Sequence, residues 1–171
     1  MSTRCRIGIK NKNGTITSIY CHWDGYPSGV GITLFKNYRD ETKIRKLMKL
    51  GDMSSLGTEP VDNPRAWEDT MPVTTDYGTW RKLYIEVHPD NMCDTYKSRG
   101  EDYPAKKSKN EKAYKKLTNE CRGEYAYLFK DGKWFVSAYD GDFKDLETGI
   151  RTRMLTYYIY DEEGILEWNK N

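Results

Sequence analysis

The sequence predicts an α+β fold: a mainly antiparallel β-sheet built from hairpins, with two or three helices packed on one face. Two pairs of alternating, β-branched or aromatic runs are each joined by a short turn containing glycine, which is typical of β-hairpins. Segments with apolar residues at helical spacing lie between these hairpins. Strands and helices do not alternate regularly, so a sheet of βαβ units is not expected. A length of 171 residues predicts a single domain.

The first hairpin is expected from residues 4–10 and 15–23, which flank the turn from Asn11 to Gly14. A helix is expected after the second strand, with Ser28 as its N-cap and apolar residues at helical spacing up to Tyr38. A second helix is expected over residues 40–50. Gly51 follows it, at the position where a glycine commonly ends a helix.

The middle of the chain is less regular. Residues 51–78 hold several prolines and glycines, and they are expected to form an irregular insertion within the domain. Residues 80–87 are predicted as a strand that is closed by His88-Pro89-Asp90, and a polar stretch covers residues 94–107. A short basic helix is expected over residues 108–121, because Ser108 and Glu111 have the spacing of a capping box.

The C-terminal third contains the second hairpin. Residues 124–130 and 133–139 flank Asp131-Gly132, a preferred two-residue turn. A further strand is predicted over residues 153–160, and a short final element over residues 164–168.

Composition restricts the class of protein only loosely. Charged residues make up 32% of the chain, but 28 Lys and Arg stand against 26 Asp and Glu, so the net charge argues neither for nor against nucleic acid. The N-terminus does not resemble a signal peptide and no apolar stretch is long enough for a membrane span, so a cytoplasmic protein is expected. The four cysteines are irregularly spaced, which favours reduced, mostly buried thiols over a zinc site.

The most informative stretch runs from residue 18 to residue 31, SIYCHWDGYPSGVG, where a thiol, an imidazole, a carboxylate and three aromatic rings precede a glycine-rich turn. A catalytic thiol is not favoured, since Cys21 and His22 point to opposite faces of a strand. A structural interpretation has His22 or Trp23 in the core and Asp24 in a turn or cap. The functional alternative is a recognition pocket where this strand meets the next helix.

In the functional interpretation, the backbone amides of residues 28–31 would face an anion such as phosphate, and Trp23 and Tyr26 would stack on a base. The stretch lacks the lysine of a P-loop. The candidate ligand-binding residues from this stretch are Tyr20, His22, Trp23, Asp24, Tyr26, Ser28 and Gly29.

Two basic clusters and one acidic set remain. The basic clusters are Lys43, Arg45, Lys46 and Lys49, and Lys106, Lys107, Lys109, Lys112, Lys115 and Lys116. Such clusters are most often solvated helix faces, although they can also contact phosphates or an acidic protein surface. The acidic residues from Asp140 to Glu147 do not match an EF-hand and are interpreted as a solvated loop.

The stretches STR at residues 2–4, IGI at 7–9 and above all YCHWDGYPSGVG at 20–31 resemble a family of small proteins that are widespread in phages, prophages and other mobile elements. Arg99-Gly100-Glu101 and the hairpin at residues 127–136 also fit that family, and Arg99 joins the candidate ligand-binding residues. The resemblance brings no catalytic residues with it. It implies a context, because small accessory phage proteins often act against host immunity.

The first hypothesis is therefore a binding protein without a cofactor, a metal site or catalytic residues. It would counter a host defence system by occluding a host protein or nucleoprotein, as an anti-CRISPR protein does, or by sequestering a nucleotide signal, in the cytoplasm of the host cell. The alternative is an enzyme that acts on nucleotides or nucleic acid, with His22 as acid or base and Asp24 or Asp90 assisting it. A structural or regulatory module is a third class, and a homo-oligomer is possible in each case.

Overall fold

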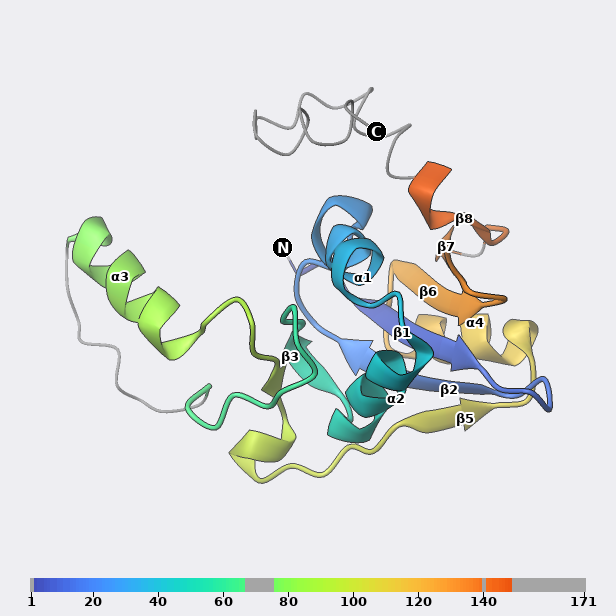
Figure 1. Cartoon of the computed structure of the whole chain (residues 1–171), viewed down its shortest axis with the longest axis horizontal. Helices are drawn as coiled ribbons and strands as arrows, with labels where there is room; N and C mark the ends of the chain where they lie inside the picture. Colours follow the sequence, from blue (N-terminus) through green and yellow to red (C-terminus); the bar gives the residue numbers. More distant parts are fainter. Residues whose placement is uncertain (1, 67–75, 140, 149–171) are drawn as a thin grey trace.

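The computed structural model describes residues 2–66, 76–139 and 141–148, and its mixed sheet and helices confirm the α+β class (Figure 1). The strands are β1 (Cys5–Lys10), β2 (Ile16–Cys21), β3 (Met53–Ser55), β4 (Asp94–Thr95), β5 (Lys106–Ser108), β6 (Tyr125–Lys130), β7 (Lys133–Ala138) and β8 (Lys144–Asp145). The helical segments are η1 (Pro27–Gly31), α1 (Ile32–Asn37), α2 (Glu41–Leu50), α3 (Tyr77–Val87), η2 (Lys97–Arg99) and α4 (Glu111–Glu120).

One sheet contains all of these strands, in the order β4-β3-β2-β1-β6-β7-β8, and β5 pairs with β2. Among the described residues five strand pairings are antiparallel, and two, β1–β6 and β2–β3, are parallel. The sheet is therefore mainly antiparallel, as the hairpin pattern of the sequence predicts.

Both predicted hairpins are confirmed. β1 and β2 pair in a register that places Cys5 opposite Cys21. β6 and β7 pair around Asp131 and Gly132, whose φ angles of 53° and 76° suit a type I′ turn. β1 also pairs in parallel with β6, so the two hairpins join into the centre of the sheet.

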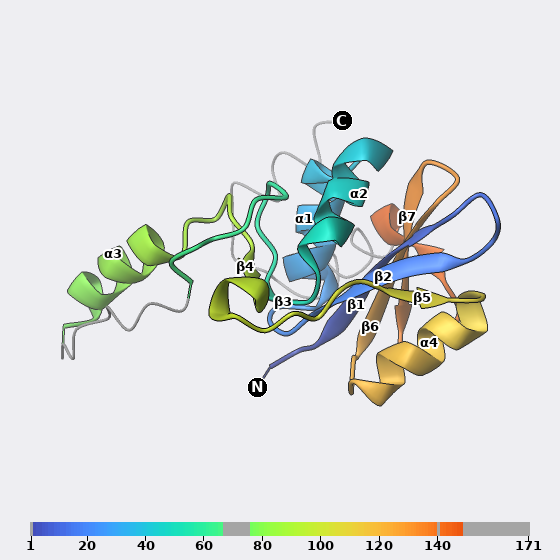
Figure 2. The same cartoon turned by 90° about the horizontal axis from the view of Figure 1, so that it is seen from below.

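Helices α1 and α2 pack on one face of the sheet, as expected (Figure 2). α2 follows Asp40, whose side chain accepts the backbone N–H of Lys43, and it ends at Gly51, which has a φ of 79°. Ile44 and Leu47 lie on the buried side of α2 at helical spacing. The predicted second helix is thus confirmed together with both of its ends.

The opposite face of the sheet is covered by α4, whereas the sequence predicts helices on one face only (Figure 2). Tyr114 of α4 is fully buried, and its hydroxyl lies 2.9 Å from the carbonyl oxygen of Arg6 and 2.7 Å from that of Tyr127. A Cβ on Gly8 of β1 would lie 3.0 Å from the Tyr114 ring. Glycine at this position therefore gives α4 the space to pack against the sheet.

The strand predicted for residues 80–87 is wrong, because these residues belong to α3. The Asp76 side chain accepts the backbone N–H groups of Gly78 and Thr79 and so caps the helix. Aromatic and β-branched residues suggested a strand, but α3 stands apart from the sheet in Figure 1, and its Tyr84 and Ile85 are exposed. Among the described residues no strand pairs with α3 and imposes extended backbone on it, so the local cap determines its conformation.

Two predicted N-caps are also wrong. Ser28 lies within η1, a π-helical turn that begins at Pro27, where the fixed φ of proline suits a first helical residue. Ser108 is a buried residue of β5, and Asn110 caps α4 by accepting the backbone N–H of Ala113. In the second case an asparagine two residues further on supplies the same kind of acceptor.

β3 lies within the segment at 51–78 that was predicted to be irregular, and it extends the sheet beside β2. The predicted elements at 153–160 and 164–168 lie outside the described residues, as does the part of the insertion at 67–75. All four cysteines are free thiols, and Cys5, Cys21 and Cys93 are buried, as expected. None of the helices in the described ranges has the length and apolar character needed to cross a bilayer.

Candidate functional site

A pocket of about 350 Å³ lies beside the ends of β2, β3 and β4, next to the C-terminal end of α3. Its volume lies in the range of small-molecule sites, roughly 300–1,000 Å³. The residues that line it come from separate parts of the chain, and they are Trp23, Asp24, Ser54, Ser55, Ala66, Tyr84, His88 and Asp94.

Hydrogen bonds to β3 position the residues that connect β2 to the pocket. The backbone N–H groups of His22 and Trp23 donate to the carbonyl oxygen of Ser54 over 3.2 and 2.9 Å. Asp24 then adopts a φ of 54°, a left-handed conformation that short polar residues tolerate, and the chain turns there. The Trp23 side chain is 46% exposed as a result.

The turn after Asp24 packs closely against neighbouring backbone. The N–H of Val30 donates to the carbonyl oxygen of Asp24 over 2.8 Å, and a Cβ on Gly29 would lie 2.4 Å from that same oxygen. The Tyr127 hydroxyl donates to the carbonyl of Gly25 over 2.8 Å. The position of Asp24 at the pocket therefore depends on glycine at residue 29.

Asp94 organises the other wall of the pocket. Its carboxylate accepts hydrogen bonds from His88 Nδ1 at 2.9 Å, from Ser55 Oγ at 2.8 Å and from Asn63 Nδ2 at 2.8 Å. The Tyr84 ring stacks on the His88 ring, with centroids 4.5 Å apart. Because a carboxylate can only accept, His88 Nδ1 is the donor in this contact.

The lining is rich in hydrogen-bond acceptors. It includes the carboxylates of Asp24 and Asp94, and none of the described lining residues is Lys or Arg. Partial burial, followed by the charges of these two carboxylates, raises the pKa of the Tyr84 phenol, which therefore stays protonated. The pocket suits a neutral or cationic group that donates hydrogen bonds, and it disfavours a phosphate inside it.

Three of the sequence-predicted residues gather at the pocket. Trp23 and Asp24 line it, and the Tyr26 hydroxyl, from a side chain that is 36% exposed, donates to Asp24 Oδ1 over 3.0 Å. The structural interpretation that placed Trp23 in the core does not hold. Cys21 is fully buried, with its Sγ near the carbonyl oxygen of Trp23, as its interpretation as a core residue predicts.

Tyr20 and His22 pair with each other instead of lining the pocket. The Tyr20 hydroxyl lies 2.7 Å from His22 Nδ1, and the rings of His22 and Trp23 form a T-shaped pair with centroids 4.8 Å apart. His22 thus packs against the indole of Trp23. Burial and then the nearby Arg4 guanidinium lower the pKa of His22.

The lowered pKa of His22 predicts that stability falls in weak acid. The unfolded chain binds more protons than the folded one between the folded pKa and the ordinary value of about 6.5, so the free energy of unfolding decreases as the pH falls through this window. We expect urea unfolding to show a larger loss between about pH 7.5 and about pH 5.5 for the wild type than for His22→Gln. Equal losses would contradict this role of His22.

Ser28, Gly29 and Arg99 are not among the residues that line the pocket. The amides of Gly29, Val30 and Gly31 donate to carbonyl oxygens of Asp24 and Tyr26, so they are not available to an anion, contrary to the expected phosphate contact. Arg99 lies on η2, where it pairs with Glu101 at 2.8 Å.

Sequence reasoning missed the residues of the second wall, above all His88 and Asp94. His88-Pro89-Asp90 marked the end of an element, but nothing local connects His88 with Ser54 or with Trp23. In the described ranges, no group of three or more His, Cys, Asp or Glu side chains has an arrangement that would hold a metal ion.

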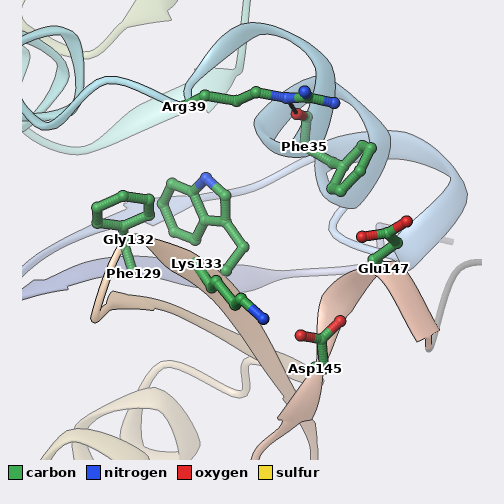
Figure 3. Close-up of a pocket in the computed structure, with 8 residues that line it drawn as sticks. Phe35, Arg39, Phe129, Gly132, Lys133, Asp145 and Glu147 are labelled. Carbon is green, nitrogen blue, oxygen red and sulfur yellow. Dashed lines mark hydrogen bonds between the residues drawn. The ribbon is translucent and has the colours of Figure 1, made fainter.

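Another cavity, of about 210 Å³, lies between α1, β7 and β8 (Figure 3). The Arg39 guanidinium lies 4.7 Å from the centre of the Phe35 ring on one side, and the carboxylates of Asp145 and Glu147 lie on another. The ring of Trp134 is almost completely buried and its indole N–H donates to a backbone carbonyl. The aromatic side of this cavity is thus part of the hydrophobic core, and none of the predicted site residues lines the cavity.

Comparisons of the chain with protein-family models, with curated proteins and with solved structures gave no match. The resemblance to the family of small phage proteins stays a prediction, and the function has to be argued from the geometry of the pocket.

Proposed function

We propose that the protein binds a planar, amino-bearing ring, of the class found in adenine, guanine and cytosine, in the pocket between Trp23 and His88. The observation that carries this proposal is an exposed indole that shares a pocket with an imidazole held by a buried carboxylate. Aromatic faces stack on planar rings, and carboxylates accept hydrogen bonds from amino groups.

The absence of Lys and Arg among the described lining residues restricts the chemical class of the ligand. A nucleobase or nucleoside fits an acceptor-rich pocket, whereas the phosphates of a nucleotide would have to extend out of it. This differs from the arrangement expected from the sequence, in which amides of residues 28–31 would hold a phosphate.

In the context that the family resemblance suggests, this binding would sequester a nucleotide signal of host defence in the cytoplasm of the host cell. Occlusion of a host protein or nucleoprotein is the other branch. It needs a broad surface with central aromatic anchors. The aromatic side chains here converge on one cavity with the size of a small-molecule site, which favours sequestration.

Truncation of Trp23 tests the proposal. In calorimetric titrations with adenosine, guanosine, cytidine and uridine, we expect the wild type to bind an amino-bearing nucleoside better than uridine. Trp23→Ala should weaken that binding about fivefold or more, because stacking of one base contributes about 1–3 kcal/mol. The fold should persist, since the Trp23 side chain is 46% exposed.

Tyr139→Ala is the matched control, because it also removes an exposed aromatic ring, which is 65% exposed and does not line the pocket. Thermal unfolding with and without each nucleoside gives an independent measurement. If no nucleoside or nucleotide binds, or if both variants bind equally well, the proposed function is wrong.

An enzyme that acts on nucleosides or nucleotides is the second candidate. His22 and Asp24 bond to Tyr20 and Tyr26 and not to each other, but His88 and Asp94 form the carboxylate–imidazole pair of a general base. Product formation that is lost in His88→Gln and kept in His22→Gln would support this candidate. Binding without turnover would leave the sequestering function.

A further inference from the structure

A basic surface lies at the other end of β2 from the pocket, around the tip of the first hairpin. An open hollow of about 470 Å³ is lined there by Lys12, Arg45 and Lys107, together with asparagine and threonine side chains of the hairpin. None of the described lining residues is acidic. We call these three cationic residues the hairpin-tip surface.

The fold assembles this surface from distant parts of the sequence. β5 pairs with β2 so that Lys107 lies opposite Thr17. Arg45 of α2 reaches the hairpin turn and donates to Asn11 Oδ1 over 3.2 Å. Figures 1 and 2 show α2, β2 and β5 side by side. One residue from each basic cluster of the sequence, Arg45 and Lys107, therefore meets Lys12 at one place.

The charges of the hairpin-tip surface are only partly neutralised. Arg45 forms an ion pair with Glu41 at 2.7 Å. In the part of the chain that the structure describes, neither Lys12 nor Lys107 has a carboxylate within 4.0 Å. Lys49 follows Arg45 by one helical turn, is exposed and extends the positive charge along α2.

We infer that the hairpin-tip surface binds the phosphate backbone of double-stranded nucleic acid. Its groups are cations and small polar side chains, the types that contact phosphate oxygens. No aromatic side chain is among the described residues that line it. Single-stranded nucleic acid is bound largely by stacking on aromatic rings, whereas a duplex presents its phosphates on the outside.

Binding of this kind is independent of sequence and depends strongly on salt. Three cations that each neutralise one phosphate predict that the logarithm of the association constant falls with the logarithm of salt concentration with a slope of about −2.7. Between about 50 and about 200 mM salt the association constant should therefore fall roughly 40-fold. Fluorescence anisotropy of a labelled mixed-sequence duplex measures this slope.

The double variant Lys12→Ala with Lys107→Ala removes the two lysines of the hairpin-tip surface. We expect at least about tenfold weaker binding at low salt and a slope of about −0.9, since one cation remains. Lys112→Ala with Lys116→Ala is the matched control, because it changes the net charge equally at exposed positions of α4, on the other face of the sheet.

Equal effects of the two double variants would overturn the inference. So would equally tight binding of a single strand, or displacement of the duplex by polyglutamate, which would indicate an acidic protein surface as the partner. Trp23→Ala should leave duplex binding unchanged, because Trp23 lies at the other end of β2. A failure of duplex binding at the hairpin-tip surface is thus distinguishable from a failure of nucleobase binding in the pocket.

Discussion

Replacement of Asp94 by alanine is expected to lower the free energy of unfolding by about 3 kcal/mol and to abolish ligand binding in the pocket. The Asp94 side chain is only 10% exposed. It accepts hydrogen bonds from His88, Ser55 and Asn63. Without the carboxylate these donors lose their acceptor in a largely buried place, and the imidazole is no longer held beside the ligand. Urea unfolding and calorimetric titration with nucleosides measure the two effects.

Two variants control this experiment. Asp94→Asn keeps one acceptor oxygen and should give an intermediate loss of stability. Asp90→Ala removes an exposed carboxylate that does not line the pocket, and it should change the free energy of unfolding by less than about 0.5 kcal/mol. If Asp94→Ala is no more destabilising than Asp90→Ala, Asp94 does not organise the wall of the pocket.

The parts of the fold that could be predicted depend on contacts between residues close in sequence. The Asp131-Gly132 turn specifies its hairpin because both residues adopt the positive φ angles of a type I′ turn. Asp40 and Gly51 bound α2 for similarly local reasons. Pairing of β1 with β6 was not predictable, since it joins residues that lie far apart in the chain, such as Ile7 and Tyr127.

The wrong strand at residues 80–87 shows how weak strand propensity is without a neighbour. Tyr84, Ile85 and Val87 are residue types that strands favour, but that preference reflects packing on a sheet. α3 has no strand beside it in the described structure (Figure 1), and the cap at Asp76 decides its conformation.

One wall of the pocket could be predicted from the sequence. Trp23 and Asp24 stood out because an unusual density of aromatic and polar groups follows a strand. His88 and Asp94 carry no such local signal, and their role depends on the pairing of β3 with β2 and β4, which brings Ser54, Ser55 and Asp94 beside the end of β2. Non-local pairing of short strands has no sequence pattern of its own, so this wall of the pocket could not be predicted from the sequence.

Gly29→Ala is expected to lower the free energy of unfolding by about 2 kcal/mol, because the new Cβ would overpack the turn. It would lie 2.4 Å from the carbonyl oxygen of Asp24, which accepts the N–H of Val30. Backbone cannot yield as a flexible side chain can, so the turn must open and move Trp23 and Asp24 out of the pocket. Nucleoside binding should therefore weaken together with stability, as thermal unfolding and calorimetry would record.

Gly78→Ala separates this clash from a general effect of replacing glycine. Its Cβ would lie 3.6 Å from a carboxylate oxygen of Asp76, which is an ordinary contact. Alanine also favours the helix that begins there, so this variant should be as stable as the wild type or slightly more stable. A Gly29→Ala protein with wild-type stability and nucleoside affinity would mean that the turn does not position Trp23, and the pocket would then need another explanation for its exposed indole.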